Sequence, residues 1–171
     1  PAGQRTQAVT VANSQTDYTF AVRAQNKAGW GEWSAPSAPR RSFGTPGAPT
    51  AVTAAEGNNT VSVSWAAGDL NGANPGDVVY QYAVGTNGWR GDWVAGGNGG
   101  SGTIGNGQVN NNGTYSIRVR AVSTVGGITE EGDPSAASNV VAPYGPIGNP
   151  SAGASANGTS ISVSWGSPPR N

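Results

Sequence analysis

A sequence pattern that recurs about one hundred residues along the chain constrains its fold more than any other feature. The segment TVSVSW at residues 60–65 returns as SISVSW at residues 160–165. Likewise, YTFAVRA at residues 18–24 returns as YSIRVRA at residues 115–121. A fixed spacing of this kind is typical of consecutive copies of one structural unit. The 171 residues therefore contain parts of more than one copy.

Apolar and polar residues alternate strictly within both repeated segments. In the first, Val61, Val63 and Trp65 are separated by serines, and residues 115–121 follow the same period of two. Because successive side chains of a strand point to opposite faces, this alternation predicts strands with one buried face. The repeated unit is therefore expected to be an antiparallel all-β sandwich.

A hairpin is predicted in the middle of the chain. Two strand-like runs, VVYQYAVGT and WRGDWV, flank Asn87-Gly88, a pair that favours the positive φ angles of a two-residue turn. We expect residues 89–94 to form a short strand. Its alternation would place Trp89, Gly91 and Trp93 on one face, and Arg90 and Asp92 on the other.

Composition narrows the function. With nine basic and nine acidic residues, the chain lacks the positive charge that nucleic-acid binding requires. It contains neither Cys nor His, so the usual zinc ligands and the commonest general base are missing. We therefore expect no catalytic residue, no cofactor and no metal site. No apolar run is long enough to span a membrane, and the absence of a starting Met suggests that the sequence begins within a longer polypeptide.

These features together resemble the fibronectin type III pattern. The resemblance rests on APTAV at 48–52, Trp65, the pair Tyr80 and Tyr82, and NGTYSIRVRA at 112–121. It implies an immunoglobulin-like β-sandwich whose core contains those aromatic residues and Tyr115. Tyr115 resembles the family's tyrosine corner, although one residue fewer than usual separates it from the preceding glycine.

The resemblance divides the chain into one complete unit and two partial ones. Residues 44–143 resemble a whole fibronectin type III domain, residues 1–43 the last strands (E, F and G) of a preceding one, and residues 144–171 the first two (A and B) of a following one. The partial units would have unpaired edges. Either the chain is a portion of a longer repeat protein, or the C-terminal A and B strands of one molecule complete the N-terminal E, F and G strands of the next, head to tail.

The tripeptide Arg90-Gly91-Asp92 is the sequence by which some fibronectin type III domains engage integrins. We consider three hypotheses for this tripeptide and its neighbours Trp89 and Trp93. The tripeptide could be an adhesion ligand, the polar residues could protect an edge strand from pairing, or the two tryptophans could stack on sugar rings.

Three other segments are candidate sites. GWGEWSAPS at 29–37 resembles the tryptophan-serine motif of cytokine receptors, which implies a structural ladder of Arg23 between Trp30 and Trp33. The loops 68–77 and 129–133 concentrate Asp, Asn and Glu, which are calcium-type ligands. Turn formation and solvated charge explain the two loops equally well.

The expected function is that of a non-enzymatic, extracellular or cell-surface repeat module. It would act as a spacer or display scaffold and contact an unidentified protein, cell surface or polysaccharide. Adhesion is one of the roles expected of such a module. The single Lys and the lack of Cys resemble repeats of secreted bacterial, especially actinobacterial, proteins. The alternative is an accessory linker or sugar-contacting module of a secreted polysaccharide hydrolase.

Overall fold

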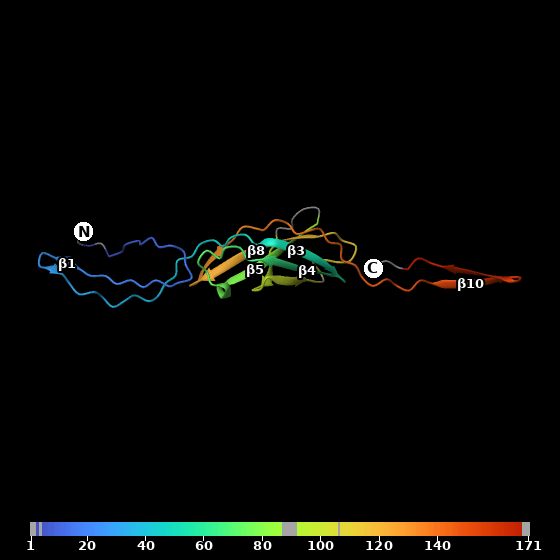
Figure 1. Cartoon of the computed structure of the whole chain (residues 1–171), viewed down its shortest axis with the longest axis horizontal. Coiled ribbons are helices and arrows are strands. Elements are labelled where there is room, and N and C mark those ends of the chain that lie inside the picture. Colours follow the sequence, from blue (N-terminus) through green and yellow to red (C-terminus); the bar gives the residue numbers. More distant parts are fainter. Residues whose placement is uncertain (1–2, 4, 87–91, 106, 169–171) are drawn as a thin grey trace.

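The computed structural model describes residue 3 and residues 5–86, 92–105 and 107–168 (Figure 1). Its regular elements, in chain order, are β1 (Gln25–Asn26), β2 (Gly29–Trp30), β3 (Thr50–Gly57), β4 (Thr60–Ala66), the short 3-10 helix η1 (Pro75–Asp77), β5 (Val78–Gly85), β6 (Val94–Gly97), β7 (Ser101–Ile104), β8 (Ser116–Val125), β9 (Ile128–Glu131), β10 (Ala152–Asn157) and β11 (Ser160–Trp165). A sandwich lies in the middle, and two thin arms extend from its opposite ends (Figure 1).

Two antiparallel sheets form the sandwich. One has the strand order β3-β4-β7 and the other the order β6-β5-β8-β9. Strand β4 alternates between buried and exposed residues, and β8 between buried and half-buried ones, as their sequences predict. The apolar faces meet between the sheets, so the all-β sandwich expected from the period-two pattern is confirmed.

The core contains the aromatic residues that the resemblance assigned to it. Trp65, Tyr80, Tyr82 and Tyr115 are all buried and belong to one hydrophobic cluster. The rings of Trp65 and Tyr80 tilt against each other across the sandwich, with centroids 5.3 Å apart. Such a tilted contact is favourable for two aromatic quadrupoles and adds to the burial of both rings.

Tyr115 closes the turn before β8. Its hydroxyl accepts a hydrogen bond from the Asn110 backbone N–H at 3.0 Å and donates one to the Asn110 side-chain oxygen at 3.1 Å. This is the geometry of a tyrosine corner, in which the phenol fixes the backbone a few residues upstream. The shortened spacing before Tyr115 therefore does not prevent the contact.

The last strand of the sandwich continues β9 in an irregular form. Backbone bonds from Ser135 and Ser138 reach the carbonyls of Val119 and Ile117, every third residue in place of every second. The serine hydroxyl oxygens accept the matching N–H groups of those two β8 residues. Serine side chains thus replace the backbone acceptors that a regular strand would supply.

The same serine pattern holds the first arm together. Ser34 and Ser37 bond to Val22 and Phe20 through both backbone and side chain. Of the E, F and G strands expected in residues 1–43, the described residues (3 and 5–43) form only the short regular strands β1 and β2. Prolines between the bonded positions lack an N–H group, which explains why this segment pairs only at intervals.

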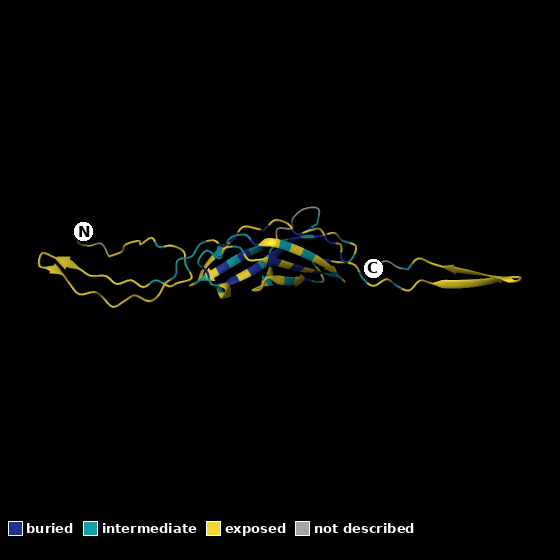
Figure 2. Cartoon of the chain, in the orientation of Figure 1, coloured by how far each residue is buried: buried dark blue, intermediate teal, exposed yellow. Residues whose placement is uncertain are grey.

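The second arm is the hairpin β10–β11, paired from Ala152↔Trp165 to Asn157↔Ser160. Every residue of both strands is exposed, as Figure 2 shows. Among the described residues, all buried ones lie between Pro46 and Pro143. The domain boundaries at residues 43/44 and 143/144 stay a prediction.

One local expectation needs correction. Of the strand predicted at residues 89–94, the described residues Asp92 and Trp93 lie outside a strand, and β6 begins at Val94, which pairs with Tyr82. The glycine-rich run 96–107 contains β7, which pairs with β4. Glycine weakens a strand, but here the neighbouring sheet edge supplies the hydrogen bonds.

Candidate functional site

The outer face of the β6-β5-β8-β9 sheet carries a stack of Trp93 and Arg120. Arg120 occupies an outward position of β8, and its Cζ lies 4.6 Å from the centroid of the Trp93 ring. Trp93 directly precedes β6 and is half-buried. A guanidinium over an indole face is a cation–π contact, so the arginine covers one face of this ring.

Arg120 also joins the three strands of this face. Its Nε donates to Gln81 Oε1 on β5 at 2.8 Å, and its Nη1 donates to Glu131 Oε2 on β9 at 2.7 Å. The strand register explains the first contact, because Gln81 and Arg120 are direct cross-strand partners. The guanidinium is therefore held in place from both sides, and its contacts make the face rigid.

The structure describes Asp92 and Trp93 of the candidate binding segment. Trp89, Arg90 and Gly91 lie outside the described residues, as does the predicted Asn87-Gly88 turn. Asp92 is exposed and borders, with Val84, Val94 and Gln108, a hollow of about 200 Å³. Neither Asp92 nor Trp93 belongs to a strand.

A second arginine–tryptophan stack lies in the first arm. The Cζ of Arg23 is 4.4 Å from the centroid of Trp30 and 4.7 Å from that of Trp33. Both rings are more than half exposed. The arrangement has the form of the ladder that the cytokine-receptor resemblance implies, and at exposed sites each such contact contributes about 0.5–1 kcal/mol.

The two stacks occupy equivalent places in the repeat. Arg23 follows Tyr18 by the same interval as Arg120 follows Tyr115. The residues that contact the two arginines from the following segment also correspond, since Trp30 precedes the glycine that bonds to Ala24, and Glu131 precedes the glycine that bonds to Ala121. One repeat thus places an aromatic ring beside the arginine, while the other places a carboxylate there and stacks Trp93, from the segment before β6, on the arginine.

A polar joint connects the first arm to the sandwich, and the sequence analysis missed it. Asn13 Nδ2 donates to Asn71 Oδ1 at 2.8 Å, and Gln15 Nε2 donates to the Ala73 carbonyl at 3.1 Å. These partners are 58 residues apart in sequence. No local pattern signals such contacts, because amide side chains are equally common in turns.

Arg41 strengthens this joint. Its Nε lies 3.0 Å from Asp17 Oδ1 in the arm, and its Nη1 lies 3.7 Å from Asp77 Oδ2 in the sandwich. The side chain is only 14 % exposed. Partial burial limits screening by solvent, so one guanidinium bridges a carboxylate on each side of the joint.

The loop 68–77, a candidate cation site, uses its oxygen atoms in other contacts. Asp69 Oδ1 accepts the Asn71 backbone N–H, and Asp77 Oδ2 accepts that of Asn74. In the second candidate loop, Glu130 accepts a bond from Thr45. Within the described part of the chain, no three acidic residues form a group that could hold a metal ion.

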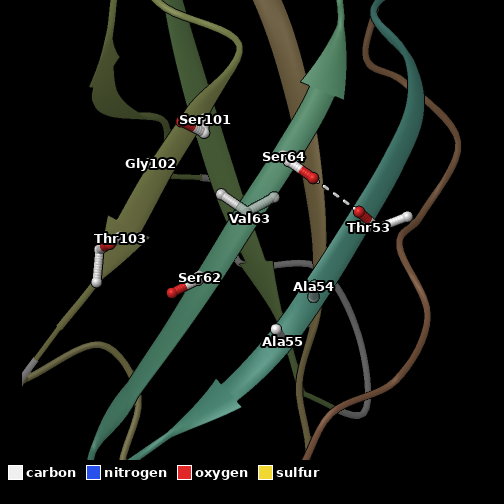
Figure 3. A pocket seen from close by; sticks show the side chains of 9 residues that line it. All are labelled: Thr53, Ala54, Ala55, Ser62, Val63, Ser64, Ser101, Gly102 and Thr103. Atoms are coloured by element: carbon white, nitrogen blue, oxygen red, sulfur yellow. Dashed lines mark hydrogen bonds between the residues drawn. The ribbon is translucent and has the colours of Figure 1, made fainter.

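A shallow hollow of about 340 Å³ lies on the outer face of the β3-β4-β7 sheet (Figure 3). Its wall consists of small residues: Thr53, Ala54, Ala55, Ser62, Val63, Ser64, Ser101, Gly102 and Thr103. The hydroxyls of Thr53 and Ser64 bond to each other at 2.8 Å. None of the lining side chains titrates near neutral pH, so this hollow offers no general acid or base.

The two central tyrosines have perturbed ionisation. Burial raises the pKa of Tyr80 above its ordinary value, because the charged phenolate loses hydration in the core. Burial also raises the pKa of Tyr82, against a smaller opposing effect of its hydrogen bond with Gln108. Both groups therefore stay neutral in the folded sandwich. Their role is to pack the core.

A search of the described helices finds none with the length and apolarity that a membrane crossing demands. No model of a known protein family matches the sequence, and no curated protein matches it either.

Solved structures do share its fold. A crystal structure of titin domains matches with a TM-score of 0.52 and 15 % identity, over 74 % of this chain and 40 % of the titin chain. The FN1-FN3 domains of chicken CNTN1 match with a TM-score of 0.49 and 24 % identity, over 90 % of this chain and 53 % of that one. Domains d3-d4 of the rat CD45 extracellular region match with a TM-score of 0.49 and 14 % identity, over 82 % of this chain and 70 % of that one.

The chain thus spans less than two thirds of the titin and CNTN1 structures it matches. The titin match and the two antiparallel sheets together assign an immunoglobulin-like, fibronectin type III β-sandwich. At this level of identity the likeness concerns the fold alone, and fold does not decide function.

Proposed function

We propose that this chain is a non-enzymatic spacer and display module of an extracellular or cell-surface protein, one of the tandem type III repeats that resemble those of secreted bacterial proteins. The observation that carries the proposal is the polar joint formed by Asn13, Gln15 and Arg41. A spacer must hold consecutive units at a defined angle, and a flexible linker alone does not do so.

The linker between the first arm and the sandwich, residues 44–47, is itself attached to the sandwich. Gly44 and Gly47 donate backbone hydrogen bonds to the carbonyls of Asn71 and Asp69, at 2.9 and 2.7 Å. The side chain of Asn71 bonds back to the Thr45 carbonyl at 3.1 Å. With three bonds over four residues, the connection has little freedom to swing.

The positions of the two arms also support a spacer. They leave the sandwich at opposite ends, so the long axis of the molecule runs through all three parts (Figure 1). Units added in the same way would extend the axis, as in other linear repeat proteins.

The orientation across the joint tests this function. Because the chain has no cysteine, spin labels can be placed at Thr19→Cys and Thr103→Cys, both exposed positions on either side of the joint. Double electron–electron resonance should give one narrow distance distribution. The pair Asn13→Ala and Arg41→Ala should broaden it, because the arm loses its main contacts with the sandwich.

Arg40→Ala is the matched control. Arg40 is the preceding residue, and within the described part of the chain its side chain bonds only to the adjacent Pro39 carbonyl. This variant should leave the distribution narrow. A broad distribution in the unaltered chain, equal to that of the double variant, would refute a spacer of fixed geometry.

Adhesion through the tripeptide is a further part of the proposal, supported by the exposure of Asp92. An integrin-type receptor would need the Asp92 carboxylate at one length, so Asp92→Glu should abolish attachment of cells to surfaces coated with the chain. Equal attachment of both proteins would dismiss the tripeptide as a ligand.

Accessory sugar binding in a polysaccharide hydrolase is less well supported. Sugar rings stack on open aromatic faces, whereas one face of Trp93 is occupied by Arg120. Trp93→Ala should therefore leave retention on cellulose, chitin and peptidoglycan unchanged. A loss of retention would favour this alternative.

A further inference from the structure

Both arms leave large apolar side chains in solvent. In the first arm, Val22 is 71 % exposed and Phe20 is also exposed. In the hairpin β10–β11, Trp165 is 74 % exposed, with Ile161 and Val163 also exposed on the same face. Figure 2 shows both arms as almost entirely exposed. A contiguous apolar face of this kind marks an interaction surface.

The sandwich shows how these two faces fit together. Val61, Val63 and Trp65 on β4 are the repeat counterparts of the hairpin's Ile161, Val163 and Trp165. Ile117 and Val119 on β8 are the counterparts of Phe20 and Val22 in the first arm. In the sandwich, both sets are buried in one hydrophobic cluster. Each arm therefore carries one half of a core that the middle unit contains complete.

The first arm has space for the missing half. A hollow of about 980 Å³ lies between its two extended segments, lined by Arg5, Thr6, Gln7 and Val9 on one side and by Phe20, Ala21 and Val22 on the other. In the sandwich, β4 pairs with β7, the strand that comes before the tyrosine corner in the sequence. Residues 5–7 precede Tyr18 by the same interval as residues 102–104 of β7 precede Tyr115.

We propose that the hairpin β10–β11 of one molecule inserts into this hollow in a second molecule of the same chain. Strand β11 pairs with residues 5–9, and Ile161, Val163 and Trp165 pack on Phe20 and Val22. The two arms of one molecule cannot meet, because the sandwich lies between them (Figure 1). The contact is therefore head to tail, and it continues to further copies unless it closes into a ring.

The completed unit has no counterpart of β5 or β6. Trp165 consequently lacks the aromatic partner that Tyr80 provides to Trp65. The association is thus weaker than the packing of the sandwich and depends on concentration. This inference is independent of the proposed function, since a monomer can also act as a spacer.

Sedimentation velocity of the whole chain over a wide range of concentration tests the inference. The mass should rise with concentration in steps of one chain. Val22→Asp in the first arm and Val163→Asp in the hairpin should each abolish the rise, because each buries a charge in the new core. The matched controls Thr19→Asp and Ser162→Asp, on the opposite faces, should retain it. Circular dichroism should show an unchanged sandwich in all four variants.

Mixing the two monomeric variants gives the sharpest result. Each keeps one intact face, so an equimolar mixture should form a dimer and nothing larger. Self-association of either variant alone would indicate hairpin-to-hairpin or arm-to-arm contact and overturn the proposal. An unaltered chain that is monomeric at every concentration, or a mixture that stays monomeric, would overturn it too.

Discussion

The guanidinium of Arg120 lies over the ring of Trp93, 4.6 Å from its centroid, and links that ring to β5 and β9. Trp93→Ala should therefore lower the free energy of unfolding of the sandwich by about 1 kcal/mol, through loss of the cation–π contact. Urea unfolding followed by circular dichroism measures it.

Trp93→Phe is the control for this change. It keeps an aromatic face under the guanidinium and should recover a large part of the loss. If Trp93→Ala unfolds at the same urea concentration as the unaltered chain, the stack contributes nothing to stability and the ring is free for another role.

The Tyr115 hydroxyl fixes the turn at Asn110. Tyr115→Phe removes both of its hydrogen bonds while keeping the ring in the core, and it should lower the free energy of unfolding by roughly 1–3 kcal/mol. Tyr144→Phe makes the same chemical change at an exposed residue and should have almost no effect. Equal stabilities for the two variants would contradict a structural role for the corner.

The serines of the irregular last strand differ in burial between repeats. Ser135 is 4 % exposed, and its hydroxyl oxygen accepts the Val119 N–H at 3.0 Å. Ser135→Ala leaves that N–H unpaired in the core and should cost about 1–3 kcal/mol by thermal unfolding. Its repeat counterpart Ser34 makes the same bond in the exposed first arm. There, water replaces the lost acceptor, so Ser34→Ala should change the melting temperature far less.

Alkaline pH should destabilise the sandwich through Tyr80 and Tyr82. Burial raises the pKa of both phenols in the folded state, so the unfolded chain releases their protons first. Their contribution is therefore complete below the ordinary tyrosine pKa of about 10 and is lost as pH rises toward the folded values. Unfolding free energies measured between pH 7 and pH 11 should fall at the alkaline end.

The matched variant for the pH dependence is Tyr80→Phe with Tyr82→Phe. It keeps both rings, so the alkaline decline should become shallower than in the unaltered chain. An identical decline in both proteins would assign the effect to other groups.

Candidate interaction residues were only partly predictable. Arg23 with Trp30 and Trp33 could be proposed from a known motif, since the partners are ten residues apart or fewer along one hairpin. The stack of Arg120 on Trp93 could not, because the pair depends on how β6 approaches β8 across β5. The contacts of Asn13 with Asn71 and of Arg41 with Asp77 could not be predicted either, because they too join residues that are far apart in the sequence.

Strand periodicity and the repeat were sufficient to determine the sandwich, its two buried faces and the aromatic core around Trp65 and Tyr115. These features depend on the side-chain period of a strand, which is a local property of the chain. Tertiary structure alone decided that Ser135 replaces a backbone acceptor, that a glycine-rich run pairs as β7, and that an arm is joined to the sandwich through Arg41. Each of these depends on groups brought together across long stretches of sequence, where residue type does not indicate the partner.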